Sequence, residues 1–390
     1  MKDIFIVGSK GIPANYGGFE TFVDNLVSRQ VSDQLKYHVA CMTFDKNAKH
    51  YDYHGAECQE ITVPNIGGAK AILYDLKALD WALAQIKQHQ LRDGIVYILA
   101  CRVGPFVKKY VKRFHQYGFQ VWVNPDGHEW KRAKWSLPVR KYWKVSEKGM
   151  VKHADYLVCD SKSIEAYIHE DYGQFNPQTT FIAYGADITA TPLTAKDAKV
   201  RDWYAKHQVK ENGYYLVVGR FVPENNYATM IKEFMQSKVQ RDFVLITNVE
   251  HNAFYDQLKQ ETHFDQDPRI KFVGTVYDAD LLKYIRENAF AYLHGHSVGG
   301  TNPSLLEALG STKLNLLLNV GFNQEVGEDA ALYWSKEAGA LSQLLEKAEE
   351  LDETTIEELG KKSKQRIADA YSWAGIVKQY EATFLAKSGN

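Results

Sequence analysis

The strongest constraint on the fold is an alternation of short apolar runs with longer amphipathic stretches along the 390 residues. Apolar runs such as 4–7 and 95–99 have the length of buried strands. Stretches such as 72–90 and 137–153 repeat their apolar residues at helical spacing. This order is typical of βαβ units, in which helices cover parallel strands. We therefore predict an α/β chain built on parallel sheets.

The alternation begins again near residue 214, after an aperiodic stretch at 183–193 that has the composition of a linker. We predict two doubly wound domains, at residues 1–187 and 188–370, a number that suits a chain of this length. Residues 371–390 contain a last amphipathic helix, WAGIVKQYEATFLAK. Its apolar face needs a cover, so we expect it to pack back on the first domain.

The composition excludes a disordered, collagen-like or disulfide-dense chain, because 45% of the residues are hydrophobic and 24% are charged. The four cysteines are far apart without a C-x-x-C pair, which favours buried, reduced thiols in a cytosolic protein. No window approaches the roughly 18 apolar residues of a membrane span. The start, MKDIFIVGSK, has no apolar signal region. We therefore expect a cytoplasmic protein whose membrane contact is peripheral.

The net charge of −1 conceals a basic block, because residues 102–152 contain 13 Lys and Arg but only 3 Asp and Glu. Within it, the segment WKRAKWSLPVRKYWK (130–144) mixes cations with aromatic residues. This pattern favours a membrane-surface contact, and we assign it to Trp130, Lys131, Arg132, Lys134 and Trp135. A single-stranded nucleic-acid site and a cationic helix with its tryptophans in the core are the alternatives.

Each predicted domain contains a glycine-rich loop directly after one of its predicted strands. In the loop GSKGIPANYGGFE (8–20), Gly17 and Gly18 would let the backbone approach an anionic ligand, or would simply make a tight turn. The loop is neither G-x-G-x-x-G nor a P-loop, which removes the main support for nicotinamide binding or NTP hydrolysis.

In the second domain, Arg220 follows an apolar run and is suited to a phosphate or to a surface ion pair. The stretch HGHSVGGTNPSLLEAL (294–309) places a glycine loop before a helix that contains Glu307. A carboxylate there can accept hydroxyl hydrogens from a ribose, or it can pair with a lysine.

This combination resembles the retaining glycosyltransferases of family 4, which have the GT-B fold of two Rossmann-like domains facing a cleft. GSKGIPANYGGFETFVDNL, NPDGHEWKR (124–132) and HSVGGTNPSLLEAL are more specifically similar to bacterial rhamnosyltransferases that use dTDP-rhamnose in capsule or cell-wall synthesis. The resemblance implies transfer of L-rhamnose from dTDP-L-rhamnose, through a β-1,4 linkage, to a lipid-diphosphate-linked sugar. It places this reaction at the cytoplasmic face of the cell membrane.

The resemblance also implies that the first domain binds the acceptor and the second the nucleotide sugar. Asp126, Glu129 and Arg220 are the candidate catalytic residues, although Asp126 and Glu129 are equally suited to pair with Lys131 or Arg132. Residues with an implied role in donor binding are Gly17, Gly18, Arg220, Asn226, Tyr277, Gly300, Thr301, Asn302 and Glu307. The implied mechanism is a front-face displacement in which a phosphate oxygen of the leaving group takes the acceptor's proton.

The chain departs from the family pattern at two places. Gly299 stands where the family has a glutamate that contacts the donor sugar, and Asn225 and Asn226 stand where it has a lysine. Because no Asp-x-Asp signature is present, we expect no metal and no other cofactor. A transferase using UDP-glucose or UDP-N-acetylglucosamine and a sugar-nucleotide epimerase are alternatives, and we expect no nucleic-acid partner.

Overall fold

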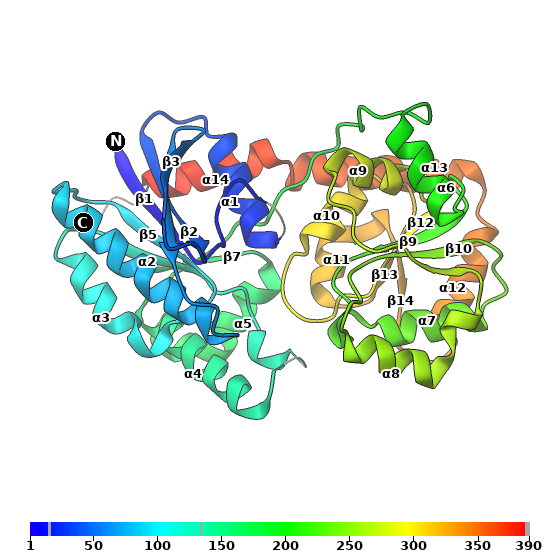
Figure 1. Ribbon diagram of the computed structural model, residues 1–390, viewed down its shortest axis with the longest axis horizontal. Helices are drawn as coiled ribbons and strands as arrows, with labels where there is room; N and C mark the ends of the chain where they lie inside the picture. Colours follow the sequence, from blue (N-terminus) through cyan, green and yellow to red (C-terminus); the bar gives the residue numbers. More distant parts are fainter. Residues whose placement is uncertain (15–16, 133–134, 387–390) are drawn as a thin grey trace. The chain divides into compact units, whose positions relative to one another are not determined.

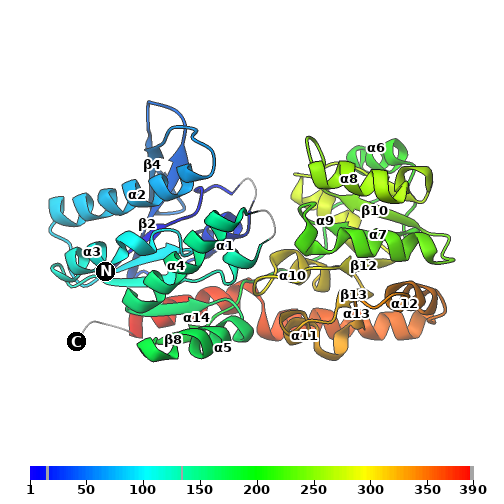
Figure 2. The same ribbon diagram turned by 90° about the horizontal axis from the view of Figure 1, so that it is seen from below.

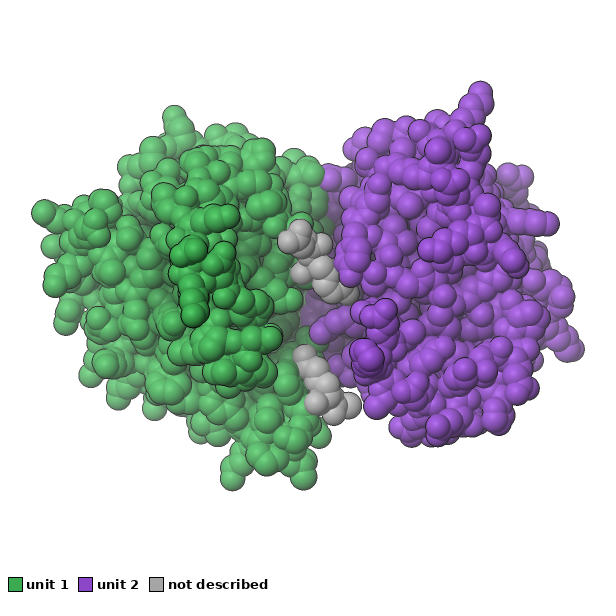
Figure 3. All heavy atoms as spheres, viewed as in Figure 1, with its two compact units in different colours: residues 1–185, 373–390 green, residues 186–372 purple. Residues whose placement is uncertain are grey.

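The computed structural model describes residues 1–14, 17–132 and 135–386 and divides into two compact units (Figure 3). Unit 1 comprises residues 1–185 and 373–390, and unit 2 comprises residues 186–372. Each unit is a parallel sheet covered by helices (Figure 1). The prediction of an α/β chain with two parallel-sheet domains is therefore confirmed.

The sheet of unit 1 has eight strands in the order β3-β4-β2-β1-β5-β6-β7-β8. All neighbours are parallel except β3 and β4. The strands are β1 (Lys2–Val7), β2 (Leu35–Thr43), β3 (His50–Tyr53), β4 (Ala56–Thr62), β5 (Ile95–Leu99), β6 (Gln120–Asn124), β7 (Tyr156–Cys159) and β8 (Thr179–Phe181). The order reverses at β1, which lies between β2 and β5, so the edge beyond its carboxyl end is a switch point of the kind that binds ligands in α/β sheets.

The hairpin of β3 and β4 was not predicted, because its sequence alternates too weakly between apolar and polar residues. Its turn is made by His54 and Gly55, which have φ angles of 49° and 83°. Two successive positive φ angles are the geometry of a two-residue hairpin loop, and glycine adopts the second without strain.

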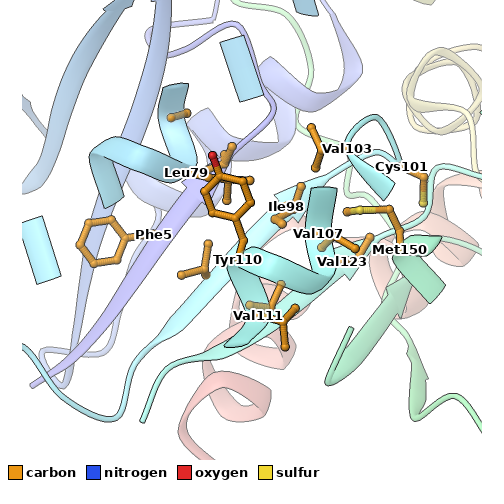
Figure 4. Close-up of a cluster of buried hydrophobic side chains, with 14 of the residues drawn as sticks. Phe5, Leu79, Ile98, Cys101, Val103, Val107, Tyr110, Val111, Val123 and Met150 are labelled. Atoms are coloured by element: carbon orange, nitrogen blue, oxygen red, sulfur yellow. The ribbon is translucent and has the colours of Figure 1, made fainter. Parts of the chain in front are cut away.

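The helices of unit 1 bury one apolar face each against the sheet. In the core they contribute Leu79, Val107 and Met150, which pack with Phe5 and Ile98 from the strands (Figure 4). The helices from the first part of the chain are α1 (Gly18–Ser28), α2 (Ala69–Gln88), α3 (Gly104–His115), α4 (Leu137–His153) and α5 (Lys162–Tyr172).

The last helix, α14 (Trp373–Ala386), belongs to unit 1 although unit 2 precedes it in the sequence (Figure 1). The ring of Phe384 lies 5.4 Å from that of Trp122 in β6. The carboxylate of Glu381 accepts a hydrogen bond of 2.8 Å from the backbone N–H of Val31. The first unit therefore covers the apolar face of this helix, as expected.

The sheet of unit 2 has six parallel strands in the order β11-β10-β9-β12-β13-β14. They are β9 (Tyr214–Val218), β10 (Asp242–Ile246), β11 (Ile270–Phe272), β12 (Ala291–His294), β13 (Asn315–Leu318) and β14 (Leu332–Trp334). The helices are α6 (Ala198–His207), α7 (Tyr227–Gln236), α8 (Ala253–Thr262), α9 (Ala279–Glu287), α10 (Pro303–Leu309), α11 (Gly321–Gly327), α12 (Ala340–Glu349) and α13 (Glu353–Ala370). The short edge strand β14 was not predicted.

The four cysteines, Cys41, Cys58, Cys101 and Cys159, are buried free thiols, as the sequence indicated. Among the described residues, none of the helices combines the length and apolar character needed to cross a membrane.

Candidate functional site

In unit 2, the strand order reverses between β9 and β12, which are neighbours at the centre of the sheet. The loop after β9 (219–226) and the loop after β12 (295–302) therefore leave the same edge. This is the position at which open α/β sheets bind ligands.

Hydrogen bonds join these two loops into one structure. Asn226, with a φ of 57°, donates from Nδ2 to the Gly295 carbonyl oxygen at 2.6 Å and to Ser297 Oγ at 3.0 Å. Ser297 Oγ in turn donates to the Glu224 carbonyl oxygen at 2.8 Å. A Cβ at Gly295 would collide with the carbonyl oxygen of Asn225, so glycine is needed for this close approach. These contacts hold the two loops together at this edge of the sheet.

Arg220 projects from the first of these loops and is solvent-exposed. Its guanidinium forms no ion pair with any residue that the structure describes. Its backbone is held, because Asn225 Nδ2 donates to the Arg220 carbonyl oxygen at 2.9 Å. The surface ion pair considered from the sequence is therefore not formed within the described chain, and Asn225 and Asn226 hold the loop.

The second loop ends in the predicted donor residues Gly300, Thr301 and Asn302. Thr301 is buried and Gly300 is half-buried. Asn302 caps α10, because its Oδ1 accepts from the backbone N–H of Ser304 at 2.9 Å. Any further contact from the Asn302 side chain must therefore come from its amide nitrogen.

Glu307 of α10 forms an ion pair of 2.6 Å with Arg286 of α9. The Arg286 side chain is only 6% exposed, whereas that of Glu307 is 40% exposed. Arg286 also donates to Ser304 Oγ at 3.2 Å, and Tyr292 lies 3.0 Å from the same hydroxyl. The buried Arg286 thus fixes the Glu307 carboxylate, which remains partly exposed to solvent. The sequence analysis expected a lysine as the alternative partner and did not single out Arg286.

Two further side chains lie near this edge. Tyr277, 71% exposed, immediately precedes the N-cap of α9. His294 ends β12, is buried, and stacks on His296 with ring centroids 5.6 Å apart. Burial lowers the pKa of His294 to about 3. A neutral imidazole therefore lies beneath the loop that carries the predicted donor residues.

In unit 1, the loop after β1 closes on a side chain of α1. The carboxylate of Glu20 accepts a 2.6 Å hydrogen bond from the Lys10 backbone N–H. Gly17 has a φ of 131°, and a Cβ there would collide with the Glu20 carboxylate. Gly17 and Gly18 thus begin a helix whose first turn already contains a negative charge, which opposes a second anion at that point.

Asp126 and Glu129, which follow β6, both pair with Arg132. Asp126 lies 3.7 Å from the Arg132 guanidinium, and Glu129 forms a direct ion pair with it. The Arg132 side chain is only 9% exposed. Trp135 Nε1 donates to Glu129 at 2.9 Å. The structure therefore forms the ion-pair alternative for both carboxylates.

The remaining residues of the predicted membrane segment divide between the interior and the surface. Trp130 is half-buried and donates to Tyr167 Oη at 3.2 Å. Lys131 is exposed, with its Nζ 5.2 Å from the centroid of the Trp130 ring. Lys134 lies outside the described residues.

Arg102 is a candidate that the sequence analysis missed. It follows β5 and donates to the carbonyl oxygens of Gly8 at 2.9 Å and Leu99 at 3.2 Å, so it links the ends of β1 and β5. Its partner is the buried Asp75, at 3.2 Å. Burial raises the pKa of Asp75 to about 6, and Arg102 opposes this rise. A charged residue directly after the apolar run 94–101 was the available signal.

Residues 1–187 match a family described as a domain of unknown function (DUF1972). No curated protein matches the chain.

Solved structures match the whole chain. Sucrose-phosphate synthase from Thermosynechococcus elongatus is 18% identical, with a TM-score of 0.79 over 99% of this chain and 100% of that one. Anabaena HepE in complex with UDP and glucose is 15% identical, with a TM-score of 0.72 over 99% and 100%. An E. coli trehalose-6-phosphate structure bound with UDP-2-fluoro glucose is 9% identical, with a TM-score of 0.75 over 98% and 99%. At these identities the fold is what the chains share, and it is the GT-B fold.

Proposed function

We propose that this protein is a retaining glycosyltransferase that binds a nucleotide sugar at the β9–β12 edge of unit 2. The observation that carries this proposal is the exposed guanidinium of Arg220, which has no ion-pair partner in the described chain and projects from an ordered loop at the switch point. A guanidinium in this position matches the charge and the fork geometry of a diphosphate. Glu307, held by Arg286, suits the hydroxyls of a ribose.

The structural neighbours support the class of ligand. One of them is described in complex with UDP and glucose, and another with UDP-2-fluoro glucose. Both match this chain over almost its full length. A nucleotide sugar is therefore the ligand class that we propose for the predicted donor residues.

For the donor we propose dTDP-L-rhamnose, on the strength of the sequence resemblance. Gly299 supports this choice, because the glutamate that the family uses on the donor sugar's hydroxyls is absent. UDP-glucose is the second candidate, and the uridine nucleotides in the neighbouring structures favour it.

For the acceptor we propose a lipid-diphosphate-linked sugar at the cytoplasmic face of the membrane, bound by unit 1 and extended through a β-1,4 linkage. The basic character of residues 102–152 supports a partner of this charge. The sequence-based assignment of the contact to residues 130–135 has to be narrowed, because Arg132 and Trp135 are engaged with Glu129.

In the proposed mechanism no side chain forms a covalent bond with the sugar. The acceptor hydroxyl attacks the anomeric carbon on the face from which the diphosphate departs, and a departing phosphate oxygen takes the hydroxyl proton. Arg220 stabilises the negative charge that grows on the diphosphate, which is the interaction that strengthens most in the transition state. We propose that this stabilisation needs neither a metal nor another cofactor.

A donor screen tests this proposal. Purified protein is given dTDP-rhamnose, UDP-glucose or UDP-N-acetylglucosamine with a lipid-diphosphate sugar acceptor, with and without a chelator, and the product mass is measured. We expect a deoxyhexose gain that the chelator does not reduce. A hexose gain alone would replace rhamnose by the second candidate, and no gain with any donor would refute glycosyl transfer to this acceptor class.

A further inference from the structure

The exposed side of α4 combines lysines with large apolar side chains. Five side chains at positions spaced by three or four residues are all solvent-exposed, and we call them the α4 stripe: Leu137, Lys141, Val145, Lys148 and Lys152. Leu137 is 77% exposed and Val145 is 56% exposed. This spacing puts all five on one face of the helix.

The neighbouring helix α3 extends the positive charge of this face. The two helices lie side by side (Figures 1 and 2). Gly104 packs against α4, where an added Cβ would collide with the backbone of Ser146. Lys108 of α3 is exposed. The pKa of His153, the last residue of α4, is lowered first by burial and then by the charges of Lys108 and Lys152.

Almost no negative charge balances these lysines. Together α3 and α4 carry nine Lys and Arg against one acid, Glu147. Glu147 is buried and accepts hydrogen bonds from Tyr167 and Tyr172. Among nearby carboxylates, Asp155 is paired with His115 and Asp171 with Lys144, while Glu170 of α5 is exposed.

The lysines of the α4 stripe keep their charge available. Lys141, Lys148 and Lys152 form no ion pair with any part of the chain that the structure describes. Lys148 and Lys152 lie over the ring of Phe175, at 5.8 and 5.5 Å from its centroid, a contact that leaves their charge uncompensated.

We infer that the α4 stripe, together with Lys108 of α3, docks on an anionic lipid surface. Lysines on a helix face attract anionic headgroups, while exposed aliphatic side chains between them enter the boundary with the acyl chains. The exposed Leu137 and Val145 favour a membrane over a nucleic acid, because the phosphate backbone of a nucleic acid has no apolar layer in which aliphatic side chains could be buried. The α4 stripe takes the place of Arg132 and Trp135 in the membrane contact, and its purpose rests on the proposed lipid-linked acceptor.

Vesicle co-sedimentation of the full chain tests this inference without donor or acceptor. We expect the protein to sediment with vesicles of phosphatidylglycerol and phosphatidylcholine, and not with phosphatidylcholine alone. Each cation near such a surface contributes about a fivefold change in partitioning. The triple variant Lys141→Gln, Lys148→Gln, Lys152→Gln should therefore partition at least tenfold more weakly.

Matched variants separate the stripe from the general surface. The control triple variant Lys196→Gln, Lys206→Gln, Lys210→Gln removes three exposed lysines of unit 2 and should bind like the unaltered protein. Leu137→Ser with Val145→Ser should weaken binding severalfold and make the remainder more sensitive to salt. Val31→Ser with Ile66→Ser, two exposed aliphatic residues elsewhere in unit 1, should not.

Three outcomes would overturn the inference. The first is equal sedimentation with neutral and anionic vesicles, and the second is equal loss in the two lysine triples. The third is an unchanged vesicle affinity of the Leu137 and Val145 double variant together with tight binding of a single-stranded oligonucleotide, which would assign the face to nucleic acid. Transfer to a detergent-solubilised acceptor should stay near normal in every stripe variant, so a failed donor screen and a failed docking test remain distinguishable.

Discussion

The carboxyl edges of the two sheets use their charged side chains in opposite ways. In unit 1, Arg132 is paired with Glu129 and Arg102 with Asp75. In unit 2, Arg220 stands exposed without an ion-pair partner among the described residues, while asparagines hold its loop. Arg102 and Arg132 of unit 1 are thus compensated by carboxylates of the same unit, whereas Arg220 has no such partner among the described residues.

This difference bears on where catalysis is expected. A preorganised cation contributes most to a reaction when its loop is already ordered and its charge is not compensated by the protein. The side-chain amides of Asn225 and Asn226 order the loop of Arg220, and the buried carboxylate of Glu224 in the same loop forms no ion pair with Arg220 among the described residues. This arrangement is the one that the proposed donor site in unit 2 requires, whereas the paired arginines of unit 1 join parts of that unit to one another.

The largest effect is expected at Arg220. Arg220→Ala should lower kcat for sugar transfer about 100- to 1,000-fold, because it removes the cation that stabilises the leaving diphosphate. Thermal unfolding should be unchanged, since the side chain is exposed. Arg201→Ala, at another exposed arginine of unit 2, should retain normal kcat. Near-normal transfer by Arg220→Ala would show that the uncompensated charge of Arg220 has no role in catalysis, and the proposed difference between the two units would fail.

In unit 1, we expect Arg132 to affect the free energy of unfolding about as strongly as Arg220 affects the activation free energy of transfer. Arg132→Met leaves the carboxylates of Asp126 and Glu129 without their cation and should lower the free energy of unfolding by about 3 kcal/mol, measured by urea denaturation. Arg113→Met removes an exposed partner of Asp80 and should cost less than about 1 kcal/mol. Affinity for the nucleotide should survive in Arg132→Met, and its loss would show that unit 1 also contributes to the donor site.

A smaller effect concerns His294 and pH. The folded pKa of His294, about 3, lies below its ordinary value, so the unfolded state binds the proton first as the pH falls. Protonation of the unfolded state therefore lowers the free energy of unfolding as the pH decreases below about 6.5. The loss is about 2 kcal/mol at pH 5. His294→Phe should remove this part of the pH dependence, which urea denaturation at about pH 6.5 and at pH 5 would measure. An identical pH dependence in the variant would contradict the buried, neutral ring.

The smallest effect is expected at Glu307. Glu307→Gln keeps an acceptor for Arg286 but replaces one carboxylate oxygen by an amide, so one ribose contact is lost. The KM for the nucleotide sugar should rise about tenfold, equivalent to about 1.4 kcal/mol, while kcat changes little. Glu350→Gln, at an exposed helix end, is the control. An unchanged KM would show that Glu307 does not bind the nucleotide sugar and serves only as the ion-pair partner of Arg286.

Strand and helix positions were predictable where the apolar pattern was strong. The buried strands at 95–99 and 214–218 and the helix at 137–153 are present as expected. The hairpin at 50–62 was missed because its polar alternation gives a weak signal, and β14 because it has only three residues.

The candidate site was predictable as a set of positions but not as a set of partners. Arg220 follows its strand and Glu307 lies in the helix after the glycine loop, as expected. The pairing of Glu307 with Arg286 joins residues on different helices, and that of Arg102 with Asp75 joins residues 27 positions apart. No local spacing rule predicts such contacts.

The sequence by itself determined the two parallel sheets, the glycine loops at their edges and the basic block in the first half. These follow from local periodicity and from the conformational freedom of glycine. Only the tertiary structure decided which charges remain uncompensated. It buried Arg132 between two carboxylates, left Arg220 exposed and left the three lysines of the α4 stripe without ion pairs among the described residues. Charge compensation depends on distances between side chains that folding brings together, and these are absent from the order of residues.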